Sequence, residues 1–205
     1  MRPIIAVLCA CIPVCACATA ANHQQLAATF DSGVAAYDAG RYEEAFKIWS
    51  GIEDEDLAAM RNVAMMLRKG EGVAKDPKKA EIFYMQAAEA GLPTAQADLA
   101  DMLLKGEAGP PDLGAALPLL QAAAAAHHPL AQFQLGELYE TGAPPLVPQN
   151  LEVARQLYAA AADRGMKEAA DRLRVVGPPA APGAVTPQPA LETAPPPAPA
   201  PAPAP

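Results

Sequence analysis

The chain has 205 residues, of which 52% are hydrophobic and only 5% aromatic, so alanine supplies much of its apolar surface. This composition favours closely packed helices over a core built on large aromatic side chains. The formal net charge is −8, from 15 basic and 23 acidic residues, and it argues against binding to nucleic acid or to anionic lipid, because both require a basic surface.

The first twenty residues have the layout of a secretory signal peptide. Arg2 gives a positively charged start, residues 4–14 are almost continuously apolar, and residues 18–20 are small, as a cleavage site requires. The alternative is an uncleaved membrane anchor, for which the apolar run is short. We therefore predict a signal peptide over residues 1–20 and a periplasmic or secreted protein.

The cysteines bear on the same question. All four lie inside the leader, at Cys9, Cys11, Cys15 and Cys17. Cleavage after Ala20 leaves a mature chain without a thiol, which excludes disulfides, thiolate-bound zinc and a cysteine nucleophile. The alternative is an outer-membrane lipoprotein, because residues 14–17 loosely resemble a lipobox. We expect membrane attachment only if Cys17 is lipidated.

Residues 24–55 are predicted to form a helix pair. Small and aromatic residues recur there at Gly33, Tyr37, Gly40, Tyr42, Ala45 and Trp49. This spacing resembles the first part of a tetratricopeptide repeat (TPR).

Three segments that follow are copies of one another at a spacing of 36 residues. The spacing holds for Ala59, Ala95 and Ala131, and for Gly70, Gly106 and Gly142. A two-residue insertion in residues 143–148 lengthens the third copy, so that the later matches are Asp76, Asp112 and Asn150, and Ala80, Ala116 and Ala154. We predict three two-helix units, at residues 56–92, 93–128 and 129–165.

The repeated residues have predicted structural roles. The alanines allow two helices to cross closely, and the glycines end first helices in a left-handed conformation. Asp76, Asp112 and Asn150 are predicted to cap the second helices, and Pro77 follows at a first helical position, where its missing N–H costs nothing. Gly91 and Gly165 are expected to end second helices, where the middle unit has His127.

The string from Lys69 to Gly91 resembles the Sel-1-like repeat (SLR), a relative of the TPR with a longer loop, and the third unit is similar to it too. The middle unit departs from the pattern, because Pro118 interrupts its predicted second helix and Leu120 replaces Tyr84. The resemblance implies an all-α fold, a right-handed α-solenoid of antiparallel helix pairs. Residues 166–176 are expected to close it as a capping helix.

The last segment, residues 177–205, has a different composition, with 12 prolines in 29 residues. Such a sequence cannot form a packed core, and we predict a disordered Pro/Ala-rich tail with polyproline II character. Two roles stay open for it, an inert linker and a spacer or proline-rich ligand.

No residue pattern indicates catalysis. The two serines have no histidine nearby in sequence, and His127 and His128 are adjacent in a turn, where they rarely bind one metal ion. We therefore predict no catalytic residue, no metal and no cofactor. Some cysteine-rich Sel-1-like proteins are described as β-lactamase-like, but they carry a cysteine pair in each repeat, which this mature chain lacks.

The resemblance also implies a binding surface, because the first helix of each unit lines the concave side in these families. The predicted inward positions are Arg61, Met65, Arg68 and Lys69, then Ala97, Asp101, Leu104 and Lys105, then Phe133, Glu137, Glu140 and Thr141. We expect a groove that is basic at one end and acidic at the other, suited to an extended peptide or a helix. The alternative is that Met65, Leu104 and Phe133 merely pack between units.

These predictions converge on a non-enzymatic scaffold or adaptor of the bacterial envelope, which binds another protein or peptide and no nucleic acid. The alternative function is binding or hydrolysis of cell-wall fragments or β-lactams.

Overall fold

A computed structural model describes the backbone of residues 13–180. The first part of the predicted signal peptide, with Cys9 and Cys11, and most of the predicted Pro/Ala-rich tail lie outside these residues.

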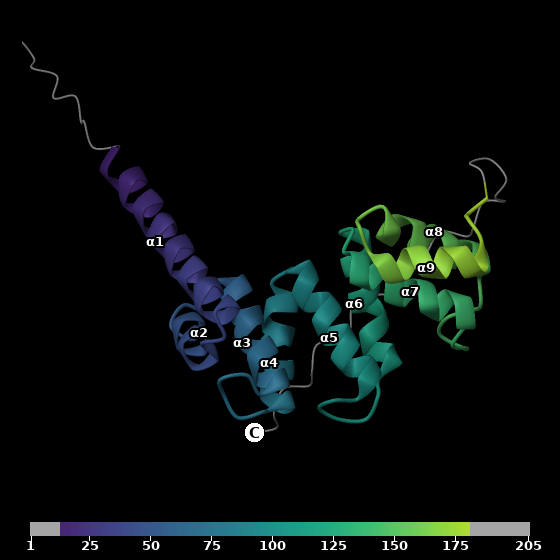
Figure 1. Cartoon of the computed structure of the whole chain (residues 1–205), viewed down its shortest axis with the longest axis horizontal. Helices are drawn as coiled ribbons and strands as arrows, with labels where there is room; N and C mark the ends of the chain where they lie inside the picture. The colour runs from purple at the N-terminus through teal and green to yellow at the C-terminus, as the bar shows by residue number, and fades with distance from the viewer. Residues whose placement is uncertain (1–12, 181–205) are drawn as a thin grey trace, which may run out of the picture.

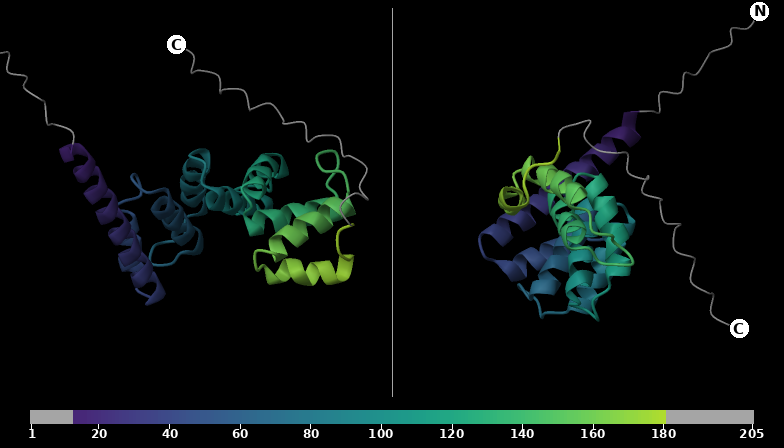
Figure 2. Two further views of the ribbon diagram at one scale, coloured as in Figure 1. Left: turned by 90° about the horizontal axis from the view of Figure 1, so that it is seen from above. Right: turned by 90° about the vertical axis from the view of Figure 1, so that its right-hand side faces the viewer.

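Within residues 13–180 the chain is all-α, and its only strand-like feature is an isolated bridge between Ala143 and Val147. The helices are α1 (Pro13–Asp38), α2 (Tyr42–Trp49), α3 (Leu57–Lys69), α4 (Pro77–Glu89), α5 (Pro93–Lys105), α6 (Leu113–Ala125), α7 (Pro129–Thr141), α8 (Leu151–Ala162) and α9 (Lys167–Val176). Each helix packs against the next along the chain. The product is an α-solenoid that runs from α1 at one end to α8 and α9 at the other (Figures 1 and 2).

The repeat appears as three helix pairs, which we call unit 1 (α3 and α4), unit 2 (α5 and α6) and unit 3 (α7 and α8). The pair α1 and α2 precedes them, and α9 packs on α8 at the far end. The fourth residue of each second helix lies where helices cross: Ala45, Ala80, Ala116 and Ala154 are all 0% exposed. A larger side chain there would force the helices apart.

Local hydrogen bonds define where the second helices begin. The side-chain oxygens of Asp76, Asp112 and Asn150 accept hydrogen bonds from the backbone N–H three residues later, at 2.9–3.1 Å. Asp56 caps α3 in the same way, with bonds from Ala58 and Ala59, a role that we did not predict. Pro77 takes the first position of α4.

The helix ends show one departure from the predicted pattern. Gly70 and Gly106 have φ of 79° and 65° and adopt the left-handed helical conformation that glycine tolerates best. Gly142 has φ of 75° but ψ of 151°, so it leaves α7 in an extended direction, at the start of the longer loop of unit 3. Gly91, Gly165 and His127 follow second helices with φ of 89°, 86° and 64°.

The prediction that Pro118 interrupts the second helix of unit 2 is wrong, because α6 continues from Leu113 to Ala125 with Pro118 inside it. Proline removes the hydrogen bond to the carbonyl four residues earlier, and here that carbonyl belongs to Gly114. Both residues are exposed, so water can solvate the unpaired carbonyl and the helix persists.

The hydrophobic core consists of two clusters that adjoin along α5. Ala95, Leu99 and Met102 of α5 belong to the first cluster, which extends back to α1. Ala97 and Ala100 belong to the second, which extends forward to α9. Because α5 has a buried face on each side, unit 2 joins the two halves of the molecule.

Helix α1 lies at the end of the solenoid, and its N-terminal half extends away from the other helices (Figure 1). Residues 22–25 are exposed, and packing against the first core cluster begins at Phe30. The Trp49 side chain donates a hydrogen bond to the Phe30 carbonyl oxygen at 3.3 Å. The helix passes through the predicted cleavage site after Ala20, and the buried core residues that the structure describes all follow that site.

Candidate functional site

The charged members of the predicted binding set lie on successive first helices, and we call the surface that they form the first-helix face. It consists of side chains from α3, α5, α7 and α9 that meet one another across unit boundaries. The clearest contact is between Arg61 of α3 and Asp98 of α5, where the guanidinium Nε donates to the carboxylate at 2.6 Å. This ion pair links the first helices of units 1 and 2 directly.

Arg68 is the centre of a larger ionic network. Its Nε donates to Glu107 at 2.7 Å, and its Nη2 reaches Glu107 and Asp101 at 2.5 Å each. The bonds to Glu107 and Asp101 raise the pKa of the Arg68 guanidinium, although burial opposes them. Its side chain is only 16% exposed, so Arg68 holds units 1 and 2 together and is not open to a partner.

Asp101 is also turned inward, at 8% exposure. Burial alone would raise the pKa of its carboxyl group, but hydrogen bonds from Arg68 and Lys105 outweigh burial and lower it. Gln134 of α7 completes the set by donating to the second carboxylate oxygen at 2.7 Å. A buried carboxylate with three donors is satisfied where it lies, so Asp101 serves the solenoid and leaves little for a ligand.

A related contact joins the leading helix pair to unit 1. The Tyr37 hydroxyl donates to Glu71 at 2.6 Å, and the Lys69 ammonium lies 3.2 Å from that hydroxyl and 3.6 Å from the Glu71 carboxylate. The hydrogen bond with Glu71 raises the pKa of Tyr37. Glu71 and Glu107 are repeat equivalents, and each binds a side chain from the preceding unit.

The far end of the face contains Glu137 and Glu140. Glu140 accepts hydrogen bonds from the Tyr158 hydroxyl at 2.7 Å and from Arg172 of α9, so it ties α7 to the last two helices. Glu137 is exposed and has no ion pair among the residues that the structure describes. Burial among the surrounding helices raises its pKa, with Arg172 opposing and Glu140 adding to the effect.

The apolar members of the predicted groove pack into the core. Met65 lies against the first cluster, Leu104 and Phe133 lie against the second, and Ala97 is fully buried. The Phe133 ring is 5.6 Å from that of Tyr158. Arg61, Arg68 and Glu140 form ion pairs with residues of neighbouring helices, so they do not contribute free charge to the predicted groove. Lys69, Lys105, Glu137 and Thr141 are exposed.

Sequence reasoning missed the partners in these contacts. Asp98, Glu107, Gln134 and Arg172 were not singled out, although each binds a predicted residue from another unit. One signal was available: the string Lys-Gly-Glu occurs at residues 69–71 and again at 105–107. The two glutamates of that string both accept hydrogen bonds from the preceding unit.

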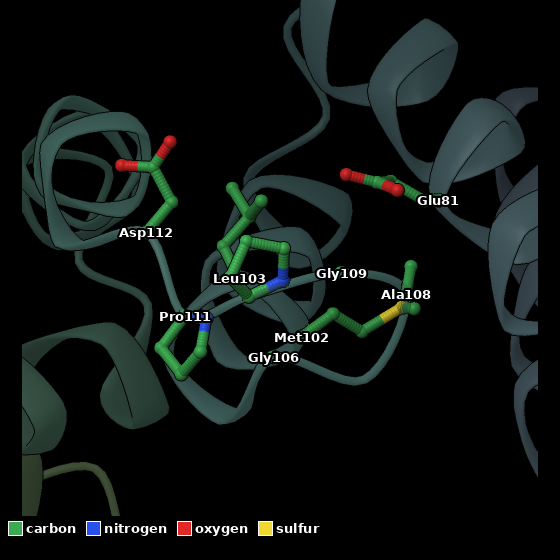
Figure 3. Close-up of a pocket in the computed structure, with 9 residues that line it drawn as sticks. Glu81, Met102, Leu103, Gly106, Ala108, Gly109, Pro111 and Asp112 are labelled. Atoms are coloured by element: carbon green, nitrogen blue, oxygen red, sulfur yellow. The ribbon is translucent and has the colours of Figure 1, made fainter.

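A small pocket lies away from this face, between α4 and the loop that joins α5 to α6 (Figure 3). Its volume is about 280 Å³. It is lined by Glu81, Met102, Leu103, Gly106, Ala108, Gly109, Pro110, Pro111 and Asp112. In the close-up the carboxyl groups of Glu81 and Asp112 lie on opposite sides of the pocket, with apolar side chains between them (Figure 3).

Metal binding and membrane insertion are two further roles to consider for residues 13–180. Among the side chains that the structure describes, no group of three or more His, Cys, Asp or Glu is placed to hold a metal ion. None of the helices in this range combines the length and apolar character needed to cross a membrane.

Stacked antiparallel helix pairs with capped second helices and small residues at the crossings define a TPR-like α-solenoid. A family model described as Sel1 repeat matches residues 57–92, 93–128 and 129–166. The chain therefore belongs to the Sel1 repeat family, whose members usually serve as scaffolds for protein interactions.

Solved structures agree with this assignment. A Sel1 repeat protein from Oxalobacter formigenes is 31% identical, with a TM-score of 0.66 over 71% of this chain and 59% of that one. A protective antigen of uropathogenic Escherichia coli with an SLR fold is 25% identical, with a TM-score of 0.67 over 78% and 35%. An immunity protein from Pseudomonas aeruginosa is 25% identical, with a TM-score of 0.56 over 73% and 57%.

The chain spans less than two thirds of the length of each of these three proteins. The comparison with curated proteins gives no match.

Proposed function

We propose that this protein is a non-enzymatic scaffold or adaptor of the bacterial cell envelope that binds another protein on its first-helix face. The observation that carries the proposal is a row of exposed charged side chains on consecutive first helices. Lys69 and Lys105 are repeat equivalents whose side chains are 48% and 59% exposed. On α7 the repeat equivalent of these lysines is Thr141, and Glu137, one helical turn before it, is the exposed charge.

The ion pairs beneath this row support the proposal. Arg61, Arg68, Asp101 and Glu107 fix the positions of α3 and α5 relative to each other. A rigid surface loses little conformational entropy when a partner binds. Charged groups at the spacing of a repeat suit an extended segment whose own contacts recur along its length.

The descriptions of the similar proteins are compatible with this role. One describes an immunity protein and another a protective antigen. The predicted leader at residues 1–20 is the basis for placing the protein in the envelope.

The binding face is tested by site-specific photo-crosslinking in the native cell. A photoreactive phenylalanine analogue at position 69, 105 or 137 is expected to capture a partner protein, to be identified by mass spectrometry. Gln86 of α4 and Gln156 of α8 are exposed on second helices and serve as matched control positions. Capture from the second helices alone would contradict the proposed face. Arg68 is unsuitable for this test, because changing it disrupts the solenoid itself.

The location is tested separately by the intact mass of the protein recovered from fractionated cells. A mass that corresponds to cleavage after Ala20, in the periplasmic fraction or the medium, is the expected result. A lipidated Cys17 in the outer-membrane fraction would instead make the protein a membrane-attached adaptor. An unprocessed chain in the cytoplasm would contradict the envelope role.

A further inference from the structure

The fifth residue of each second helix differs in kind from one pair to the next, and at one position it has no identified role inside the solenoid. These residues are Phe46, Glu81, Leu117 and Arg155. Phe46 and Leu117 are partly buried against the two core clusters. The Arg155 guanidinium donates to the Val176 carbonyl oxygen of α9 at 2.7 Å. Three of the four are therefore used inside the solenoid, and Glu81, which is partly buried, has no polar partner among the described residues.

The loop opposite Glu81 departs from its own pattern too. At the preceding junction the start of α2 lies directly on Gly72, where a Cβ would be 2.3 Å from the Tyr42 carbonyl carbon. The repeat equivalent of Gly72 is Ala108. Because Ala108 carries a Cβ, the start of α4 cannot approach this loop as closely. A pocket with a carboxylate on one wall therefore takes the place of the direct backbone contact at Gly72, where the preceding junction has only a more open hollow, lined by residues 40–44 and 72.

The pocket has an apolar interior and an acidic rim. Met102 is 1% exposed and forms part of the interior with Leu103, while Pro111 forms a wall. Glu81 and Asp112 lie on opposite sides of the pocket, and the Asp112 carboxyl group is turned toward the start of α6 (Figure 3). One oxygen of Asp112 caps α6 by accepting from Ala115, which leaves its second oxygen without a partner among the described residues.

The volume and the lining of the pocket indicate which class of ligand it can bind. A volume of about 280 Å³ is slightly below the ~300–1,000 Å³ of most small-molecule sites, so it suits one long side chain better than a cofactor. A metal ion is disfavoured because two carboxylates over an apolar interior do not satisfy its coordination. Arginine fits, since its alkyl stem packs on apolar surface while its planar guanidinium pairs with carboxylates.

We propose that the pocket formed by Glu81, Met102, Leu103, Pro111 and Asp112 binds an arginine side chain from a segment of a partner protein. The net charge of −8 favours approach of a basic segment. This site is separate from the first-helix face and does not depend on whether that face binds a partner.

The test is an NMR titration of the ¹⁵N-labelled full-length protein with N-acetyl-arginine amide. We expect saturable shifts of the Gly106, Ala108 and Gly109 amide signals at millimolar concentrations of the probe. N-acetyl-citrulline amide, which has the same shape without the charge, should leave them unmoved. Equal shifts with the two probes, or shifts spread over the acidic surface, would overturn the proposal.

Two variants and a control complete the experiment. Glu81→Gln is expected to weaken binding about fivefold, a loss of about 1 kcal/mol. Glu89→Gln, on the same helix and exposed, should bind like the unchanged protein. Glu81→Leu introduces an apolar residue, as α2 has at Phe46 and α6 at Leu117, and should abolish binding while leaving helical content and melting temperature undiminished. Unaltered binding by Glu81→Gln, or an equal loss of binding in Glu89→Gln, would contradict the proposal that this pocket binds arginine.

Discussion

At the junction between units 1 and 2, Arg68 reaches across to Asp101 and Glu107. At the junction between units 2 and 3 the repeat equivalents of Arg68 and Glu107 are Leu104 and Ala143, which both lie against the second core cluster. The same repeat geometry is thus held by an ionic network in one place and mainly by apolar packing in the other, where Gln134 also donates a hydrogen bond to Asp101. The difference indicates that helix stacking fixes the repeat geometry. The side chains that meet at a junction can be ionic or apolar, provided that both partners are of the same kind.

The two junctions should respond differently to loss of their central side chain. Replacing Arg68 with Ala leaves the Asp101 and Glu107 carboxylates without their main partner in a largely buried position. We expect a loss of about 2–3 kcal/mol in the free energy of unfolding, measured by urea denaturation followed by circular dichroism. Arg164→Ala, at an exposed position of the α8–α9 turn, is the control and should cost less than about 0.5 kcal/mol. Equal losses in the two variants would show that the network contributes no more than a surface charge.

The apolar junction should lose less from a comparable truncation. Leu104→Ala removes methyl groups from a partly buried site, so we expect a loss of about 1–2 kcal/mol in the same urea experiment. A loss larger than that of Arg68→Ala would reverse the ranking of the two junctions.

Interactions inside a unit provide a reference for both junctions. Asp112→Ala and Asn150→Ala each remove the cap of one second helix, and each is expected to cost about 1 kcal/mol, irrespective of junction type. Calorimetric melting of the two variants side by side measures this. If the stability losses of the two variants differ by more than the contribution of one cap, the caps also stabilise contacts between units.

The smallest effect is confined to low pH. Hydrogen bonds from Arg68 lower the pKa of Glu107, and with Lys105 they outweigh burial to lower the pKa of Asp101. Both carboxylates therefore stabilise the folded protein above their ordinary pKa values, near 4, and lose this contribution as the pH falls through the lowered values.

We expect the melting temperature of the unchanged protein to fall more steeply between pH 5 and pH 3 than that of Arg68→Leu. The difference in melting temperature between the two proteins should decrease by about 2 °C over this pH range. Melting curves recorded at intervals of pH give the answer, and parallel curves would show that the network does not respond to protonation.

Local features were predictable from the sequence in a way that contacts across units were not. The caps at Asp76 and Asp112 and the left-handed ends at Gly70 and Gly106 depend on residues three or four positions away. The ionic contacts join residues 33 to 39 positions apart. A charged residue in a repeat can face solvent or a neighbouring unit, and the sequence around it does not show which of the two occurs.

By itself the sequence determined the repeat, the Sel1 character of the three units, the all-α fold and the small residues at helix crossings. These follow from periodicity and from hydrogen bonds that a short segment makes with itself. Only the tertiary structure decided that Arg68 and Asp101 are neutralised within the solenoid, that α6 continues through Pro118, and that a pocket opens beside Glu81. Those outcomes depend on which side chains of other units lie within bonding distance and on which backbone groups water can reach.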